Sequence, residues 1–513
     1  MSTAPSVRSS CSFRTRVAVF VRGRRTVRRR RLIIEPLESR TLLSLAPLGA
    51  EFRVNETIDL DQRATPGGAV AADASGAFAV AWSSQQGDSS GDEVYVRAYN
   101  ADGSPRTSEL RLNEYRAGDQ TAPAIASDDL GNMVIVWQSA GQDGDGWGIY
   151  GRRFTGTTLG PIEIPINQST LGNQTDSQVA WNGGSSFVVV WSSSSADPAH
   201  TGIFARRFGW DGIAWGDEFR VDGGSAAVGE PAVAMDAAGN FTVAWTAWQA
   251  DGTRDVYARF FSPDAAPLGG EFLVNSCTAG DQAEPTVAMA DSGTTVIAWS
   301  SWGQDDGGWG IYAQRWNLAG GPQSGEFQVH SWAWNDQQQP AVAMDRGGNF
   351  VITWTSWHQD GSSAGVFAQA YDAIGVPRGA EFRANSSSGN DQLNPSVALD
   401  AEGHAVVVWQ GWWHWDGNAA DVFAQRYQFG YSDVRLLKDI APGADSSSAS
   451  PRSFAQVGQQ AFFVRASGPS NGLWVSDGTR DGTKLVKDFA GAVREAAVEP
   501  RSDVLDQSGV SLR

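Results

Sequence analysis

The chain has 513 residues, of which 41% are hydrophobic and 19% charged, with 59 Gly, 22 Trp and only three Lys. This composition argues against long solvated helices and favours a β protein rich in turns. The net charge is −18 although 11 Arg stand in the first 40 residues, so the acidic remainder excludes the phosphate-neutralising surface that nucleic acid requires. No run approaches the roughly 18 apolar residues of a transmembrane helix, and we expect a monomer.

Residues 1–48 form a basic leader. The 11 Arg of residues 1–40 stand against two Glu, and the apolar run Val17–Val21 is short. A secretory signal peptide has a longer apolar core and a small-residue cleavage site. The composition by itself predicts a disordered basic segment.

The end of this leader carries a motif. Four arginines, Arg28–Arg31, precede Leu37-Glu38-Ser39-Arg40-Thr41-Leu42-Leu43-Ser44. The segment resembles the LEPR-XLL segment that opens many large surface or exported proteins of planctomycete-type bacteria, with Ser39 in place of Pro. The resemblance implies an extracellular or cell-surface location.

A repeat follows the leader. One Trp ends a β-rich run seven times, at intervals of 54 or 55 residues, and a strand that begins with Glu stands 27 to 31 residues before each of them. The Trp residues are Trp82, Trp137, Trp191, Trp245, Trp299, Trp354 and Trp409, and the Glu residues are Glu51, Glu109, Glu163, Glu218, Glu271, Glu326 and Glu381. Seven copies therefore fill residues 51–430.

Each copy contains four β segments. The Glu strand alternates apolar and polar residues, whereas the Trp strand is almost continuously apolar, as in Phe241–Trp245. A continuous apolar strand is covered on both faces. An Asp-x-x-Gly turn, such as Asp73–Gly76, precedes the Trp strand in five copies, and an Asp-Gln pair, such as Asp119-Gln120, recurs in five. We assign both to architecture, because a residue needed once per copy serves the turn it stands in.

Four-stranded units of about 55 residues predict a seven-bladed β-propeller over residues 51–430, with the recurring Trp on an inner strand. A β-solenoid has shorter rungs, and sandwich domains need about 100 residues each. Both fit the spacing less well.

Residues 431–490 differ from the repeat and contain all three Lys. The runs Gln460–Val464, Gly472–Thr479 and Gly482–Asp488 predict a partial second β-repeat segment. Gly472-Leu473-Trp474-Val475-Ser476-Asp477-Gly478-Thr479 is similar to the ELWxxDGT repeat of bacterial surface proteins, with Gly472 at the first position. A lone repeat lacks a neighbour on which to bury its face. We therefore expect this chain to be a piece of a longer protein. Residues 491–513 form a polar tail.

Loops after the Trp strands offer candidate metal ligands. Asp143 with Asp145 and Asp305 with Asp306 stand in Gly-containing loops, where carboxylates can gather around calcium. A solvated turn explains the same residues, because no loop has a complete calcium pattern.

The same loops contain Trp residues. Trp302, Trp357 and Trp412 each follow the recurring Trp by three residues, with Gln304, Gln359 and His414 close by. They predict a rim on adjacent blades that stacks on sugar rings, the alternative being that the rings seal one blade against the next.

Catalytic motifs are weak. The five His share no repeat position and no metal-like spacing, and no nucleophile elbow or phosphate loop occurs. We therefore expect a non-catalytic surface propeller that serves structure, adhesion or protein interaction. Alternatives are a lectin-like propeller and, third, a secreted propeller hydrolase or lyase.

Overall fold

The structure is a computed structural model that describes residues 46–428, except 59, 86–90, 225–226, 306, 362 and 413–418, and the backbone of four strands between residues 451 and 488. The chain divides into two units, residues 1–431 and 432–513. Most of the predicted leader and the whole polar tail lie outside the described residues.

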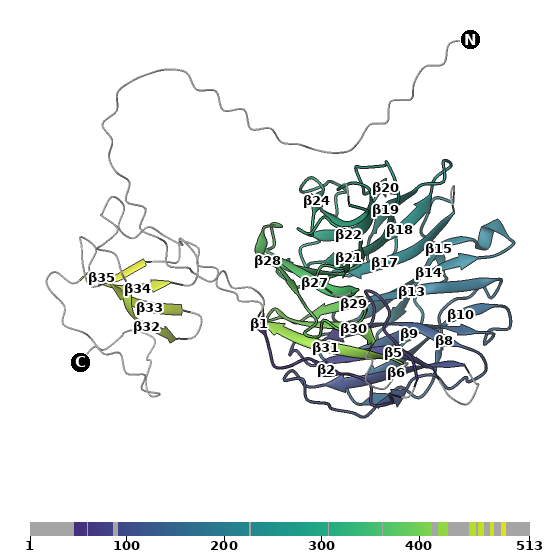
Figure 1. Ribbon diagram of the computed structural model, residues 1–513, viewed down its shortest axis with the longest axis horizontal. Helices are drawn as coiled ribbons and strands as arrows, with labels where there is room; N and C mark the ends of the chain where they lie inside the picture. The colour runs from purple at the N-terminus through teal and green to yellow at the C-terminus, as the bar shows by residue number, and fades with distance from the viewer. Residues whose placement is uncertain are drawn as a thin grey trace, which may run out of the picture. The chain divides into compact units, whose positions relative to one another are not determined.

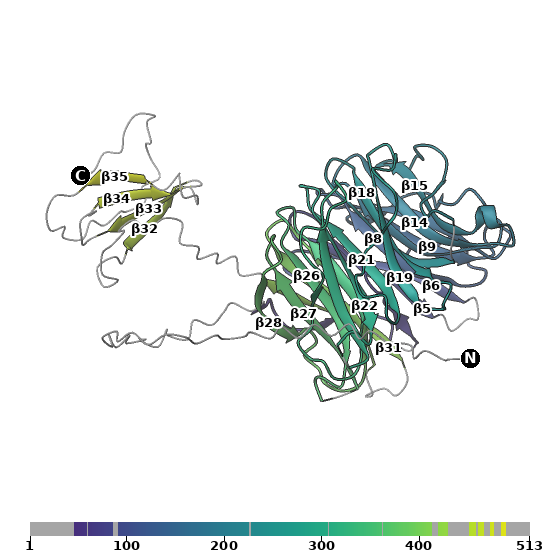
Figure 2. The same cartoon turned by 90° about the horizontal axis from the view of Figure 1, so that it is seen from above.

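The first unit is all β and forms a ring of seven antiparallel sheets (Figures 1 and 2), which confirms the seven-bladed propeller. The first three blades contain the following strands. Blade 1 has β3 (Gln62–Arg63), β4 (Val70–Ala72), β5 (Phe78–Gln85), β6 (Asp92–Tyr99) and β7 (Leu110–Arg111). Blade 2 has β8 (Gln120–Ser127), β9 (Asn132–Ala140), β10 (Trp147–Thr155), β11 (Thr158–Leu159) and β12 (Ile164–Pro165). Blade 3 has β13 (Asn173–Trp181), β14 (Ser186–Ser194), the 3₁₀ turn η1 (Pro198–His200), β15 (Gly202–Gly209) and β16 (Phe219–Arg220).

The other four blades follow the same order. Blade 4 has β17 (Val228–Met235), β18 (Phe241–Trp248), β19 (Arg254–Phe261) and β20 (Phe272–Leu273). Blade 5 has β21 (Gln282–Met289), β22 (Thr295–Trp302), β23 (Trp309–Trp316) and β24 (Phe327–Gln328). Blade 6 has β25 (Gln337–Met344), β26 (Phe350–Trp357), β27 (Ala364–Tyr371) and β28 (Pro377–Arg383). Blade 7 has β29 (Gln392–Leu399), β30 (His404–Trp412), β31 (Ala420–Gln428), β1 (Ala46–Pro47) and β2 (Phe52–Arg53).

The ring is closed by the start of the chain. β1 and β2 pair with β31 (Figure 1). In this pairing Phe52 lies opposite Ala424 and Arg53 opposite Phe423. Each predicted Glu strand is therefore the outer strand of the preceding blade, and the sequence repeat is offset by one strand from the blade. Pairing the two ends of the ring in one sheet removes the open edge that an unclosed array would expose.

The core lies between the blades. All seven recurring Trp are at most 1% exposed, and they occupy the second strand from the axis. In three blades the buried Gln of the Asp-Gln pair accepts a hydrogen bond from this indole; for example, Trp82 Nε1 lies 2.9 Å from Gln62 Oε1. In these three blades the Trp is buried between two sheets while its N–H is satisfied, which explains why the two residues occur together there.

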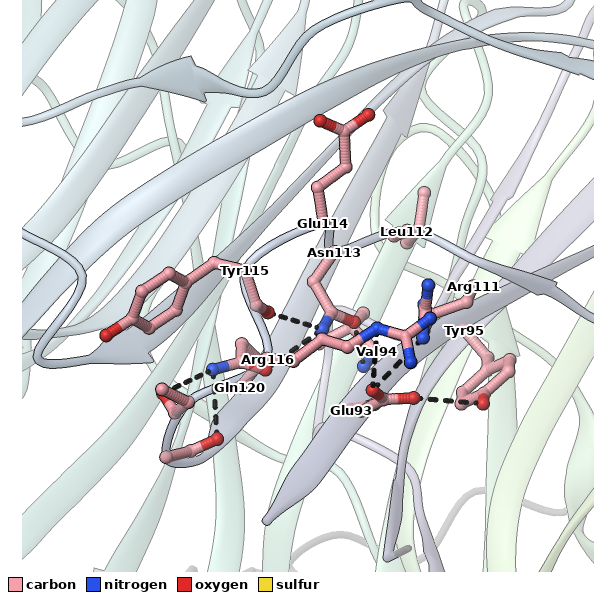
Figure 3. A network of polar contacts seen from close by, with 12 residues as sticks. Glu93, Val94, Tyr95, Arg111, Leu112, Asn113, Glu114, Tyr115, Arg116 and Gln120 are labelled. Carbon is pink, nitrogen blue, oxygen red and sulfur yellow. Dashed lines mark hydrogen bonds and ion pairs between the residues drawn. The ribbon is translucent and has the colours of Figure 1, made fainter. Parts of the chain in front are cut away.

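A polar residue after each outer strand, Asn in five of the seven blades, joins the loops to the sheet. Asn113 accepts a hydrogen bond from Val94 N at 3.0 Å and donates to Tyr115 O and Gln120 Oε1, each at 2.9 Å (Figure 3). The equivalent residues receive the same backbone hydrogen bond in all seven blades; they are Asn55, Asn167, Asp222, Asn275, His330 and Asn385.

The Glu that begins each outer strand links neighbouring blades. Glu271 accepts from Gly223 N at 2.8 Å, and Glu326 accepts from Ser276 N at 2.8 Å. Glu51 accepts from Ser386 N at 2.6 Å, which extends the same link across the closure of the ring. All seven Glu make this contact with the preceding blade. The Glu repeat is therefore an inter-blade clamp.

The Asp-x-x-Gly turns are tight hairpins, as predicted. Asp73 Oδ1 accepts from Ser75 N at 2.8 Å and from Ala77 N at 3.1 Å, and Gly76 has a φ of +82°. That φ suits Gly because it carries no Cβ. The carboxylates of Asp128, Asp236, Asp345 and Asp400 accept equivalent backbone hydrogen bonds.

The second unit contains one antiparallel sheet of four strands, β32 (Pro451–Val457), β33 (Gln460–Arg465), β34 (Gly472–Ser476) and β35 (Lys484–Asp488). Its assignment to an ELWxxDGT-like repeat stays a prediction. Within the part of the chain that the structure describes, no helix has the length and apolarity that crossing a bilayer requires.

Candidate functional site

The innermost strands surround a central channel. The strands β4, β8, β13, β17, β21, β25 and β29 are neighbours around the axis. In blades 2 to 7 this strand has a β-bulge near its start, and one non-glycine residue in each bulge has a positive φ of 51° to 57°. These residues are Ala122, Asp176, Glu230, Glu284, Gln339 and Asn394. Such backbone conformations cost on the order of 1–3 kcal/mol each and cluster at functional sites.

The chemistry of this ring changes from blade to blade. Blade 2 contributes Ala122, blades 3 to 5 contribute three carboxylates, and blades 6 and 7 contribute the amides Gln339 and Asn394. All of these residues except Asn394 line a cavity of about 270 Å³. The channel is therefore acidic on one side only.

Hydrogen bonds connect successive members of the ring. Glu230 Oε2 accepts from Thr246 Oγ1 at 2.7 Å and from Glu284 N at 3.0 Å. Glu284 Oε2 accepts from Ser300 Oγ at 2.7 Å and from Gln339 N at 2.9 Å. Each of these two carboxylates thus holds the bulge of the next blade.

Asp176 lies in a different environment. Its side chain is exposed to the solvent of the channel and lines the cavity, where the neighbouring blades displace part of the surrounding water. Burial raises the pKa of Asp176, a hydrogen bond from Thr175 opposes this effect, and the charge of Glu230 adds to it. Neighbouring carboxylates whose environments differ in this way can divide the roles of acid and base between them.

Blade 1 closes the channel below this ring. Its inner strand is interrupted, and residues 64–69 run between β3 and β4. Gly67 N donates to Pro395 O at 3.0 Å, and Gly68 O accepts from Ile125 N at 3.0 Å. A Cβ on Gly67 would lie 3.9 Å from Thr286 of blade 5, so this segment crosses the channel. The cavity is a cup with residues 65–67 in its wall and floor.

The opposite end of the channel carries an ion pair. Arg346, which follows β25 in blade 6, pairs with Asp129, which follows β8 in blade 2. The pair joins two blades that are not neighbours in the ring, so it spans the axis. Together with the blade 1 segment, it makes the channel accessible from one face of the propeller.

The predicted Trp rim lies on that accessible face. Gln282, at the start of β21, is opposite Ser301, and Trp302 is the next residue of β22. Trp302, Trp357 and Trp412 all end their strands, so they emerge at one end of adjacent blades, as predicted. Trp302 is 47% exposed, whereas Trp357 and Trp412 are half-buried. Sequence reasoning missed Trp334, which is 73% exposed and lies in the loop before β25.

The polar residues proposed beside the rim have structural contacts. Gln304 accepts from Ser301 Oγ at 2.8 Å and donates to Glu326. Gln359 accepts from Ser356 Oγ at 2.7 Å and donates to Glu381 at 2.6 Å. These contacts tie each loop to its own outer strand, and His414 lies outside the described residues.

The candidate calcium ligands also have protein partners. Asp143 Oδ2 accepts from Asn167 Nδ2 at 3.3 Å, and Asp145 Oδ2 accepts from Gly172 N at 3.0 Å. Asp305 Oδ2 lies 2.7 Å from Nε2 of the buried His330. Asp306 lies outside the described residues, and among those described no group of His, Cys, Asp and Glu could hold a metal ion.

The bulge residues that surround the channel, called the carboxylate ring below after Asp176, Glu230 and Glu284, were not identified from the sequence. Its residues precede a Pro or Ser in the middle of a strand, and their side chains differ between copies. One signal was present: 11 residues stand between Asp61 and Asp73 in blade 1, whereas eight stand between Asp119 and Asp128 in blade 2. This insertion breaks the repeat at the channel.

No protein-family model matches the sequence, and no curated protein is significantly similar to it. Solved structures resemble the fold. A protein of unknown function from Dyadobacter fermentans has 11% identity and a TM-score of 0.41, over 74% of this chain and 99% of that one. An ulvan lyase, a polysaccharide lyase, has 11% identity and a TM-score of 0.44, over 70% and 93% of the two chains. An α-L-arabinanase from Penicillium chrysogenum, in complex with arabinobiose, has 12% identity and a TM-score of 0.41, over 74% and 97%.

We expected a chain without enzymatic activity, and this expectation is corrected here: the solved propellers that resemble its fold include a polysaccharide lyase and an arabinanase, so a propeller fold is no sign of a non-catalytic protein. Identities this low bear on the fold alone. The repeat of the sequence marks residues that are architectural, whereas the channel residues differ between blades and therefore leave no repeated signal.

Proposed function

We propose that the protein is a carbohydrate-active hydrolase whose substrate enters the channel from the Trp-bearing face. The observation that carries this proposal is a ring of strained bulges around one cavity, in which Asp176 stands in the blade next to that of Glu230, whose Oε2 accepts two hydrogen bonds. Glycoside hydrolysis needs two carboxyl groups of opposite protonation state.

The architecture alone does not require these charges. In blade 6 the amide Gln339 takes the same place, and its Oε1 accepts from Thr355 Oγ1 at 2.9 Å and from Asn394 N at 3.2 Å. A neutral side chain therefore makes the same two contacts as Glu230 and Glu284. Carboxylates at blades 3 to 5 carry a desolvation cost that an amide avoids, so their charge points to chemistry rather than to packing.

The two carboxyl groups have distinct roles in this mechanism. Asp176 retains its proton to a higher pH than an ordinary Asp and donates it to the glycosidic oxygen as the bond to the anomeric carbon breaks. Glu230 accepts a proton from the water that attacks that carbon. The proton passes from water to Glu230 while Asp176 gives one to the leaving alcohol, which balances the hydrolysis.

Exposed Trp residues near the mouth supply the binding surface. Trp302 and Trp309 pack edge to face at 5.6 Å between ring centroids, and Trp302 keeps nearly half of its surface in solvent. An exposed indole with a fixed orientation provides a flat apolar face for a sugar ring at little entropic cost.

The experiment compares Asp176→Asn with a matched control, Glu402→Gln, on an exposed acid in a turn at the opposite end of the channel. Release of reducing sugar is measured on neutral polysaccharides, together with retention on the immobilised polymer. We expect Asp176→Asn to lower hydrolysis about 10²- to 10⁴-fold, the usual contribution of a general acid, with unchanged retention. Equal rates of hydrolysis for the two variants would contradict the assignment of Asp176 as the general acid. Retention of the wild type on the polymer without hydrolysis would indicate a lectin and contradict the hydrolase proposal.

We also propose that the protein acts outside the cell or on its surface. The LEPR-XLL-like leader and the ELWxxDGT-like segment support this location, and an adhesion or protein-binding role of the second unit would be compatible with it. Fractionation that finds the full chain in the cytosol would contradict it.

A further inference from the structure

The cup formed by the blade 1 insertion is shallow. The floor segment contacts the inner strands two to three residues beyond the bulges: Gly68 O accepts from Ile125 N, and Ala69 N donates to Ser396 Oγ at 3.0 Å. Two residues of a strand span roughly 6–7 Å. The space between the carboxylate ring and the floor therefore matches the depth of one sugar ring.

The volume leads to the same conclusion. The cup holds about 270 Å³, just below the range of roughly 300–1,000 Å³ that is usual for small-ligand pockets. With the floor beneath the ring and the Arg346–Asp129 pair at the far end, a polymer has no way through the axis. Only the end of a chain can enter.

The lining defines the charge of that sugar. Of the described residues that line the cup, three are carboxylic acids and none is Lys, Arg or His. A uronate or a sulfated sugar would bring its own negative charge against Asp176, Glu230 and Glu284. Ser177, 1% exposed and in the cup wall, has a hydroxyl without a hydrogen-bond partner among the described residues, so the wall holds a polar group that the protein leaves unsatisfied.

We propose that the cup binds the terminal residue of a neutral glycan, so that cleavage at the carboxylate ring releases monosaccharides from the chain end. This inference rests on the proposed hydrolase function and adds its mode of action. The floor segment, residues 65–68, is then a specificity-determining element that sets how many sugar rings lie beyond the scissile bond.

The sequence of blade 2 suggests a matched variant. Removing Thr65, Gly67 and Gly68 turns the blade 1 run Asp61-Gln62-Arg63-Ala64-Thr65-Pro66-Gly67-Gly68-Ala69-Val70 into Asp-Gln-Arg-Ala-Pro-Ala-Val, close to Asp119-Gln120-Thr121-Ala122-Pro123-Ala124-Ile125. Blade 2 shows that a strand of this length and pattern completes a blade without a crossing segment. The variant should open the floor of the cup.

The test uses the full chain and labelled hexasaccharides from arabinan, xylan and cellulose, with a polygalacturonate fragment as the anionic control. We expect the wild type to release monosaccharide as the first product from a neutral substrate, leaving the labelled chain one unit shorter, and the three-residue deletion to release longer products.

Oligosaccharides as first products of the wild type, or preferred cleavage of the anionic fragment, would overturn this inference while the hydrolase proposal stands. No cleavage of any glycan would overturn the hydrolase proposal and the inference with it. If the deletion does not fold, the wild-type product pattern still decides.

Discussion

The Glu residues that clamp neighbouring blades and the bulge residues that surround the channel follow the repeat differently. Every blade has the Glu clamp, and each makes the same contact with the preceding blade. The channel position has a common strained backbone in six blades but carries Ala, acid or amide. A side chain that is repeated with its contact serves the fold, whereas a repeated backbone with changing side chains offers a place for chemistry.

The largest effect is expected where the repeat is most strictly kept. Trp299→Ala removes a fully buried indole that donates to Gln282 at 3.0 Å, and should lower the free energy of unfolding by about 3–5 kcal/mol, the usual cost of emptying an aromatic core site. Trp302→Ala, three residues later and 47% exposed, is the matched control and should cost less than about 1 kcal/mol. Equal losses in denaturant unfolding would remove the distinction between core and rim.

The Glu clamps provide a smaller effect that tests the closure of the ring. Glu51→Ala breaks the link across the closure to Ser386, and Glu271→Ala breaks an internal link to Gly223. Each should lower stability by about 1 kcal/mol, the typical value of a hydrogen bond. A much larger loss for Glu51→Ala, measured by thermal unfolding, would show that the closing blade is weaker than the others.

Asp176 should make the stability of the folded protein depend on pH. Its pKa is raised in the folded protein, so the folded state binds this proton more tightly than the unfolded chain does. The stabilisation is fully present at pH values below the pKa of the unfolded chain, near 3.8. It is lost as the pH rises from that value through the raised pKa of the folded protein. Asp176→Asn should remove this part of the decline, and an unchanged profile of stability against pH would contradict the environment described for Asp176.

The acids of blades 4 and 5 should be structurally replaceable. Because Gln339 makes the same two contacts, Glu284→Gln should change the free energy of unfolding by less than about 0.5 kcal/mol. The same substitution at Glu230 should keep the fold and lower hydrolysis. A stability loss of several kcal/mol in either variant would show that the charge is architectural.

The smallest expected effect is that of calcium. Asp143 and Asp305 already accept hydrogen bonds from Asn167 and His330, so millimolar calcium should leave the melting temperature unchanged. A rise with calcium concentration would reveal a bound ion, because a ligand that binds only the folded state stabilises it by mass action.

The sequence determined the number of blades and the strands within each. Trp82 and its six equivalents are spaced by one blade, and a strand that is buried on both faces reads as a continuous apolar run, so local pattern and burial agree. The roles of the Asp-x-x-Gly turns and the Asp-Gln pairs were predictable for the same reason, since their contacts lie within one blade or its adjoining loop.

Only the tertiary structure decided which residues meet at the axis. Asp176, Glu230 and Glu284 are separated by 54 residues at each step, and no local rule marks them, because their proximity results from closing seven sheets into a ring. The same closure brings Gly67 of blade 1 near Thr286 of blade 5 and turns a three-residue insertion into the floor of a cup. Long-range contacts of this kind depend on how the blades pack around the axis, which the period of the repeat does not specify.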